Sequence, residues 1–405
     1  MPTTAETPLP SAGHPEAETQ SVGIGAVVWS LVRVVALLYL FLVGVEALSS
    51  GIKALGGGVM DSALGSQSNP FVGLVIGILA TTLVQSSSVT TSLVVGLVGS
   101  GQVSVAAAVP IIMGANIGTT VTNTIASMAH AARSEEFRRA FAAATCHDFF
   151  NFMAVALLLP MELVGRSLFG VGPLEALSGV VSGVLVGGGG ATYHSPLKSA
   201  FKAGVGALKQ LTEAFGLEGK VAAIALSLLG AVLIFVTLAL IVRVMRVLVL
   251  ARVEVYINRF LGAGGPVAML VGIIVTVSVQ SSSITTSLLV PLAGAGIVTL
   301  GQIYPITLGA NVGTTVTALL ASMAASGSGA QVAVQIALVH LFFNLFGILV
   351  LYVPAPMRDL PLKGARWLAG VAARSRRWAV AYVLGMFYAL PAVLVLLGRW
   401  FGGAA

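Results

Sequence analysis

The sequence predicts an all-α integral membrane protein built from two inverted-topology repeats, and three observations support this prediction. Of the 405 residues, 57% are hydrophobic and only 9% are charged, and the mean hydropathy is +0.99. Soluble domains carry about 25% charged residues, so this composition excludes soluble enzymes, disordered proteins and nucleic-acid binders despite a net charge of +7. Apolar runs long enough to cross a bilayer recur along the chain. Finally, two internal segments resemble each other closely.

The order of apolar and polar segments predicts the division of the chain. The first residues contain no Lys or Arg and so lack the basic start of a signal peptide. We expect a disordered cytoplasmic tail (1–25), a first repeat (26–170), an external linker with an amphipathic helix (171–215), a second repeat (216–354) and a basic cytoplasmic amphipathic segment with a terminal span (355–405). About seven full spans are expected at 27–48, 104–127, 140–160, 219–250, 303–325, 331–353 and 379–400, with two helical hairpins at 70–99 and 266–296. The glycine-rich stretch 171–190 is not expected to form a full span.

Clusters of basic residues indicate the sidedness. They fall at 133–139, 243–259 and 358–377, and the positive-inside rule places all three in the cytoplasm of a multi-pass protein of the cytoplasmic membrane. The N-terminus is then cytoplasmic and the C-terminus external. An odd number of spans separates the two similar segments, so the second copy is inverted relative to the first.

The internal repeat aligns residues 85–128 with residues 280–323 without a gap, and 26 of the 44 aligned positions are identical. The match concentrates in a Gln-Ser-Ser-Ser block and in a Gly-Ala-Asn-x-Gly-Thr-Thr-x-Thr block, and a looser His-x-x-x-Asn match follows at 147–151 and 340–344. Duplicated helices also occur as inert packing. Identity in polar residues instead favours a function, and inverted repeats with a site near the bilayer midplane are typical of transporters.

The Gln-Ser-Ser-Ser blocks interrupt apolar runs whose halves are each too short to span a bilayer, which predicts re-entrant hairpins. A helix N-terminus at a hairpin tip offers unpaired N–H groups and a partial positive charge. Hydroxyl and amide donors beside it suit an oxyanion that must bind and leave. The alternative is that the hydroxyls bond only to helix carbonyls. The candidate anion-binding residues are Gln85, Ser86, Ser87, Ser88, Gln280, Ser281, Ser282 and Ser283.

The Gly-Ala-Asn blocks follow Pro110 and Pro305 within apolar runs. Proline and glycine favour an unwound stretch, whose carbonyls, together with Asn and Thr oxygens, are suitable Na⁺ ligands. A small-residue packing motif is the alternative. The candidate sodium ligands are Asn116, Thr119, Thr120, Asn311, Thr314, Thr315 and Thr317.

Asp148 is the one aspartate within a predicted span, and its counterpart in the second repeat is Leu341. A carboxylate inside a membrane is costly and indicates a function. It could bind sodium or carry one coupled charge. A local salt bridge with Arg138 or Arg139 is the alternative.

These blocks resemble the type II sodium-dependent inorganic phosphate cotransporter family, as a bacterial member. The paired Gln-Ser-Ser-Ser segments, the run from Pro110 to Ile125 and the run from Phe137 to Pro160 carry the resemblance, which covers about residues 30–395. It implies phosphate import driven by Na⁺ as the coupling ion, with phosphate at the two hairpin tips. It also implies sodium at Asp148 and at 310–314, although Ala310 stands where the family has serine. Because the electroneutral form of the family carries glycine in place of the aspartate, Asp148 implies electrogenic transport.

Other function classes fit the sequence less well. A transporter of another oxyanion or of a dicarboxylate could share this architecture. An intramembrane enzyme would find Ser, His and Asp here, but the sequence lacks paired membrane aspartates, a metal-binding His motif or a Gly-x-Ser-x-Gly elbow, so no enzymatic activity is expected. A channel should show a continuous pore lined by polar residues, whereas the two tips instead predict a closed, two-sided binding site. The expected partners are phosphate, sodium and the lipid bilayer, and a homodimer is left open by the sequence.

Overall fold

The computed structural model describes residues 24–55, 69–187, 196–260, 264–325 and 329–393, and every regular element in these ranges is helical. The predicted tail lies almost entirely outside them. Six segments are long and apolar enough to cross a membrane, which confirms the all-α membrane prediction. They are α1 (Ile24–Leu55), α5 with α6 (Val105–Gly118, Val121–Ser127), α7 (Ser134–Phe169), α10 (Gly219–Phe260), α13 (Leu300–Ser322) and α14 (Gly329–Leu351).

The seventh expected span, 379–400, lies only partly within the described residues. α16 (Arg376–Leu384) and the π-helical turn Gly385–Ala389 cover its start, after the basic helix α15 (Ala355–Arg374). The stretch that we did not expect to span contains α8 (Pro173–Gly187), whose 15 residues fall short of the roughly 20 that a bilayer requires. A helix, α9 (Pro196–Ala214), also occupies the place of the expected amphipathic helix.

Both predicted hairpin segments are pairs of short helices interrupted at the same place in each repeat. α3 (Pro70–Val84) and α4 (Ser87–Gly99) flank the first interruption, and α11 (Gly265–Val279) and α12 (Ser282–Gly294) flank the second. The members of each pair have 15 and 13 residues and contact each other. Each helix alone is too short to cross a bilayer.

The predicted unwinding of the Gly-Ala-Asn block occurs in only one repeat. In the first repeat, Thr119 and Thr120 form a turn between α5 and α6. In the second repeat, α13 runs without interruption through the corresponding Thr314 and Thr315, so the prediction is wrong there. Pro305 and Gly313 are tolerated inside α13, and the local sequence alone therefore does not break the helix.

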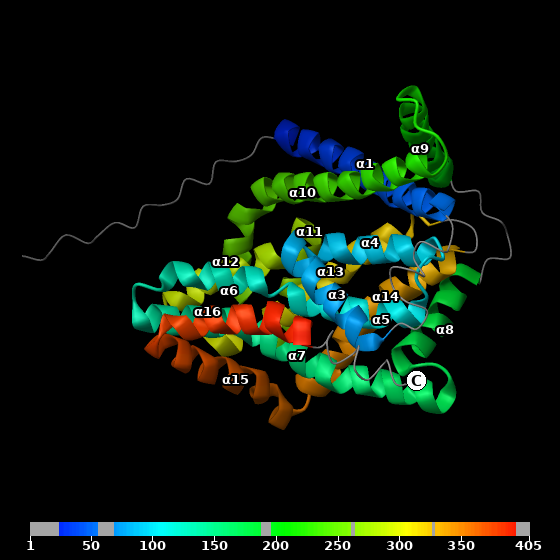
Figure 1. The fold of residues 1–405 in the computed structure, drawn as a ribbon. Coiled ribbons are helices and arrows are strands. Elements are labelled where there is room, and N and C mark those ends of the chain that lie inside the picture. The colour runs from blue at the N-terminus through cyan, green and yellow to red at the C-terminus, as the bar shows by residue number, and fades with distance from the viewer. Residues whose placement is uncertain (1–23, 56–68, 188–195, 261–263, 326–328, 394–405) are drawn as a thin grey trace, which may run out of the picture.

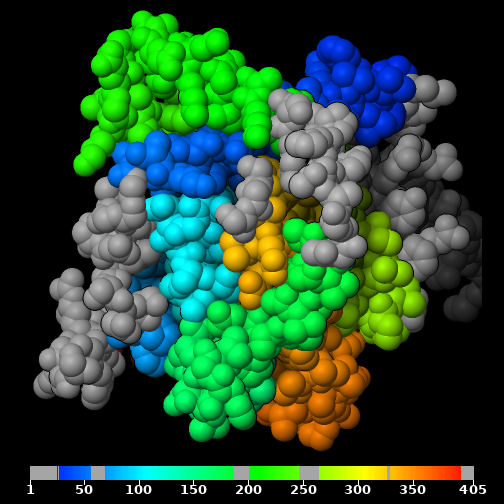
Figure 2. All heavy atoms as spheres, turned by 90° about the vertical axis from the view of Figure 1, so that its right-hand side faces the viewer, coloured from blue at the N-terminus to red at the C-terminus, as the bar shows by residue number. Residues whose placement is uncertain are grey.

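The helices pack in corresponding pairs, as expected for two copies of one unit. α3 packs on α5 as α11 packs on α13, and α8 contacts α14 as α15 contacts α7. α1 and α10, the first long helices of the two copies, lie side by side along one edge of the molecule (Figure 1). Figure 2 shows the face of the molecule on which α8, drawn in green, lies against α14, drawn in yellow-orange.

Four glycines allow the α3–α5 and α11–α13 backbones to approach closely. A Cβ at Gly77 would collide with the carbonyl oxygen of Ile111, and one at Gly114 would collide with that of Leu74. The equivalent Gly272 and Gly309 face the carbonyl oxygens of Ile306 and Met269 in the same way. Small residues that bring helix backbones together are a principal means of helix association in membranes. This packing supports the hairpin tips in both repeats.

We expect Gly77→Ala or Gly272→Ala to destabilise the protein by about 1–3 kcal/mol, because the added methyl group meets backbone that cannot rotate away. The measurement is the unfolding temperature of the detergent-solubilised chain. Gly206→Ala is the matched control, because nothing lies within 4 Å of its added Cβ on α9. An equal unfolding temperature for Gly77→Ala and Gly206→Ala would contradict this account.

Candidate functional site

The two hairpin tips share one uncommon backbone conformation. Gln85 and Gln280 both have φ 56° and ψ 27°, and they are the only non-glycine residues with positive φ in the described part of the chain. This left-handed conformation is costly for a residue with a Cβ and often marks functional sites. It ends the first helix of each hairpin and allows the next helix to begin two residues later.

The side chains of Gln85 and Gln280 form hydrogen bonds with equivalent partners in the two repeats. Each amide nitrogen donates to a backbone carbonyl three residues earlier, of Thr82 in the first repeat and of Val277 in the second. Each amide oxygen accepts a hydrogen bond from a threonine of the following long segment. Thr122 donates to Gln85 at 2.7 Å, and Thr317 donates to Gln280 at 2.9 Å. These contacts assign the glutamines a positioning role, and Thr317 belongs to the second tip.

The serines of each tip divide into a cap and a pair with unused hydroxyl groups. Ser86 and Ser281 cap α4 and α12 by accepting from the backbone N–H of Val89 and Ile284. The hydroxyls of the next two serines make no hydrogen bond to any described residue. Ser87 and Ser88 are nevertheless 6% and 5% exposed, and Ser282 is 4% exposed. Serine hydroxyls at a helix N-terminus, free of protein partners on largely buried residues, are the arrangement expected of an anion site.

The two Gly-Ala-Asn blocks meet the His-x-x-x-Asn segments of the opposite repeats. Nε2 of His147 lies 2.6 Å from Oδ1 of Asn311, whose amide nitrogen donates to Oδ1 of Asn151 at 3.0 Å. In the mirrored arrangement, Nε2 of His340 lies 3.3 Å from Oδ1 of Asn116. All these side chains are buried, with at most 4% exposed. The structure therefore brings Asn116 and Asn311 together as parts of a network between repeats.

The predicted threonine ligands of sodium are less clearly placed at a cation site. The hydroxyls of Thr119 and Thr314 donate to the carbonyls four residues earlier, and those of Thr120 and Thr315 to carbonyls three residues earlier. A hydroxyl that donates its hydrogen in this way keeps oxygen lone pairs with which it can bind a cation. These threonines thus use their hydroxyl hydrogens within the helix, and whether their oxygens accept a cation stays a prediction.

Asp148 is buried in α7 with 1% of its surface exposed. Tyr382 of α16 donates to its Oδ2 at 2.6 Å, and the Thr120 and Thr124 hydroxyls also interact with the carboxylate. Oδ1 has no hydrogen-bond partner. No ion pair joins Asp148 to a basic residue in the described part of the chain, and Arg138 is paired with Glu135 instead. The oxygens beside the α5–α6 turn therefore fit a cation such as Na⁺, which would offset a buried charge.

Two residues of the site were missed by the sequence reasoning. Asn123 exchanges hydrogen bonds with Thr286 and accepts from Ser287, so it ties α6 to the second hairpin. Its counterpart in the second repeat is Ala318, and this polar departure from the repeat was a usable signal. Tyr382 lies outside the repeats, and no sequence pattern pointed to it.

A cavity of about 170 Å³ adjoins the second tip. Gln280 and Thr317 line it together with Val34 of α1 and Leu238 and Ile241 of α10. The α1–α10 pair thus borders the polar tip directly, with apolar side chains on the other walls.

Comparisons with known proteins give matches over most of the chain. The family model described as Na⁺/Pi-cotransporter matches residues 40–181 and 232–361. Human sodium-dependent phosphate transport protein 2B is 33% identical over 89% of this chain and 64% of its own length. Sodium-dependent phosphate transport protein 2A from rat is 34% identical and from mouse 35% identical, each over 94% of this chain and 69% of the relative. The chain thus spans about two thirds of these relatives. No solved structure matches it significantly.

Proposed function

Since the chain belongs to the Na⁺/Pi-cotransporter family, we propose that it is a symporter that couples the inward movement of Na⁺ to the uptake of inorganic phosphate. The relatives that it matches are named sodium-dependent phosphate transport proteins. We place it in the cytoplasmic membrane with its N-terminus inside, in keeping with the basic clusters.

The observation that carries the proposal is the pair of corresponding hairpin tips. Each offers two serine hydroxyls without protein partners at the start of a helix, beside a glutamine that holds the tip in place. Phosphate binds there, between neutral donors whose number and orientation compensate for the absence of a buried cationic side chain. Neutral donors bind an oxyanion without trapping it, which suits a site that must release its ligand.

Sodium supplies the missing positive charge on the same account. Asp148, with an unpartnered carboxylate oxygen and two threonines nearby, is the proposed ligand and the carrier of the coupled charge. It occurs in one repeat only, and the Na⁺ that it binds crosses with its charge unbalanced, which makes transport electrogenic. Asn116 and Asn311 hold the two repeats in register around the ions.

The deciding experiment is uptake of radiolabelled phosphate into proteoliposomes with an inward Na⁺ gradient. We expect uptake above that driven by an equal K⁺ gradient. An excess of sulfate or succinate tests whether another oxyanion or a dicarboxylate is preferred. Uptake no greater than in the K⁺ control would refute the proposal, and uptake of the competitor in place of phosphate would favour the alternative substrate.

Removing a tip glutamine should lower the rate of uptake roughly tenfold or more, since each glutamine makes two hydrogen bonds worth about 1 kcal/mol each. Gln85→Gly and Gln280→Gly are the sharpest variants, because glycine tolerates the positive φ, so the loss of the side chain and its hydrogen bonds adds no backbone strain. The matched control is Gln102→Ala, in the α4–α5 connection away from the tip. Unchanged uptake in both glycine variants would remove the tips from the site.

Asp148→Gly should abolish the phosphate-induced current while sparing part of the electroneutral phosphate flux. Without the carboxylate, the site no longer holds the cation whose charge crosses unbalanced. Current and tracer flux are measured on the same preparation, with the exposed Asp359→Asn on α15 as the control for loss of an acidic group. A current equal to that of the unmodified chain would end the assignment of charge coupling to Asp148.

A further inference from the structure

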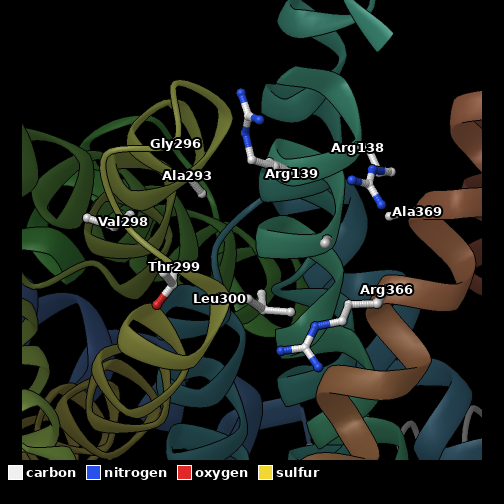
Figure 3. Close-up of a pocket in the computed structure, with 10 residues that line it drawn as sticks. Arg138, Arg139, Ala293, Gly296, Val298, Thr299, Leu300, Arg366 and Ala369 are labelled. Atoms are coloured by element: carbon white, nitrogen blue, oxygen red, sulfur yellow. The ribbon is translucent and has the colours of Figure 1, made fainter. Parts of the chain in front are cut away.

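A second cavity lies apart from the hairpin tips, and three arginines are part of its lining. It has a volume of about 330 Å³ and lies between the start of α7, the link from α12 to α13, and α15. Figure 3 shows Arg138 and Arg139 on α7 and Arg366 extending from α15 toward α7. None of the three has a role in the proposed transport site.

Two of the three positive charges in this cavity lack a carboxylate partner. Arg138 is paired with Glu135 at 2.8 Å. Arg139 donates from Nε to the carbonyl oxygen of Gly294 at 2.9 Å, which orients its guanidinium, and it forms no ion pair with a carboxylate of the described residues. Arg366 makes no hydrogen bond or ion pair with any described residue. The nearby Glu136 is paired with Arg133 at 2.7 Å. The cavity therefore carries an excess of positive charge.

The shape and chemistry of the walls select the class of ligand. Guanidinium groups present planar pairs of N–H donors that match the oxygens of a phosphoryl group. The opposite wall is apolar and contains Ala293, Val298 and Leu300. Gly296, with φ +77°, places no side chain over Arg139, whose Cζ would lie 3.6 Å from a Cβ there. The site is thus open to an anion that has, or lies beside, an apolar group.

We propose that this cavity binds a phosphoryl oxyanion, either the headgroup of an anionic phospholipid or free inorganic phosphate. The arginines belong to the basic clusters that predict the cytoplasmic face, and basic pockets between membrane helices on that face bind anionic headgroups. The occupant joins α7, which carries Asp148, to the end of the second hairpin and to α15. It therefore stabilises the contact between the two repeats without touching a residue of the proposed transport site, and independently of substrate binding at the tips.

The experiment measures thermal unfolding of the full chain in an uncharged detergent during titration with one of three additives. These are phosphatidylglycerol, phosphatidylcholine and inorganic phosphate, all added in sodium-free buffer. The variant is Arg366→Gln, because Arg366 makes no hydrogen bond or ion pair with a described residue whose loss would disturb folding. The matched control is Arg374→Gln, which removes the same charge from the same helix outside the cavity. Phosphate binding at the hairpin tips is common to all variants and cancels in the comparison.

We expect phosphatidylglycerol or phosphate, and not phosphatidylcholine, to raise the unfolding temperature. Arg366→Gln should raise the half-maximal concentration of the active additive about fivefold, and Arg374→Gln should behave like the unmodified chain. The additive whose half-maximal concentration rises in Arg366→Gln identifies the source of the phosphoryl group, either a lipid headgroup or free phosphate. Arg139→Gln combined with Arg366→Gln should enlarge the shift. An equal shift in Arg374→Gln, or none in Arg366→Gln, would overturn the proposal. Because uptake is measured separately, this failure is distinct from a failure of the proposed transport.

Discussion

The contacts between the Asn and His side chains of opposite repeats are the constraint on which the rest of the structure depends. In an apolar environment a buried amide or imidazole without a partner costs several kcal/mol. Neither repeat satisfies these groups alone: Asn311 of α13 requires His147 and Asn151 of α7, and Asn116 of α5 meets His340 of α14. The two halves are therefore held in one register, and a slip of a single helical turn would leave several buried polar groups unpaired.

The close backbone contacts serve the same end by another means. Where Gly77 and Gly114 bring α3 onto α5, and Gly272 and Gly309 bring α11 onto α13, each hairpin is fixed to the long segment that carries the Asn of the network. The threonines that bind the tip glutamines lie on the same chain segments, at Thr122 and Thr317. Packing, network and tip thus form one connected support in each repeat.

The sequence predicted what depends on repetition and failed where the repeats differ. The hairpin interruptions at Gln85 and Gln280 followed from the aligned blocks, because identical local sequences face equivalent surroundings, whereas the capping role of Ser86 and Ser281 was not predicted. The break between α5 and α6 was predicted, but the continuity of α13 was not, because Thr119 and Thr314 have nearly the same neighbours in sequence. The Tyr382–Asp148 contact was equally inaccessible. Its partners are far apart in the chain, and only the packing of α16 brings them together.

The differences between the repeats have a mechanical consequence for the two tips. Asn123 on α6 forms hydrogen bonds with Thr286 and Ser287 of α12. In the second repeat Ala318 takes the place of Asn123, and Thr91 and Ser92 of α4 donate to the carbonyl of Ser88 within their own helix. A shift of α12 against α6 therefore breaks side-chain hydrogen bonds, whereas the matching shift of α4 against α13 breaks none of this kind.

The second hairpin is the more firmly held, and it is held by α6, the helix that begins at the turn beside Asp148. Any rearrangement of that turn on cation binding thus acts on both hairpins through α6: on the second through Asn123, and on the first tip through Thr122, which donates to Gln85.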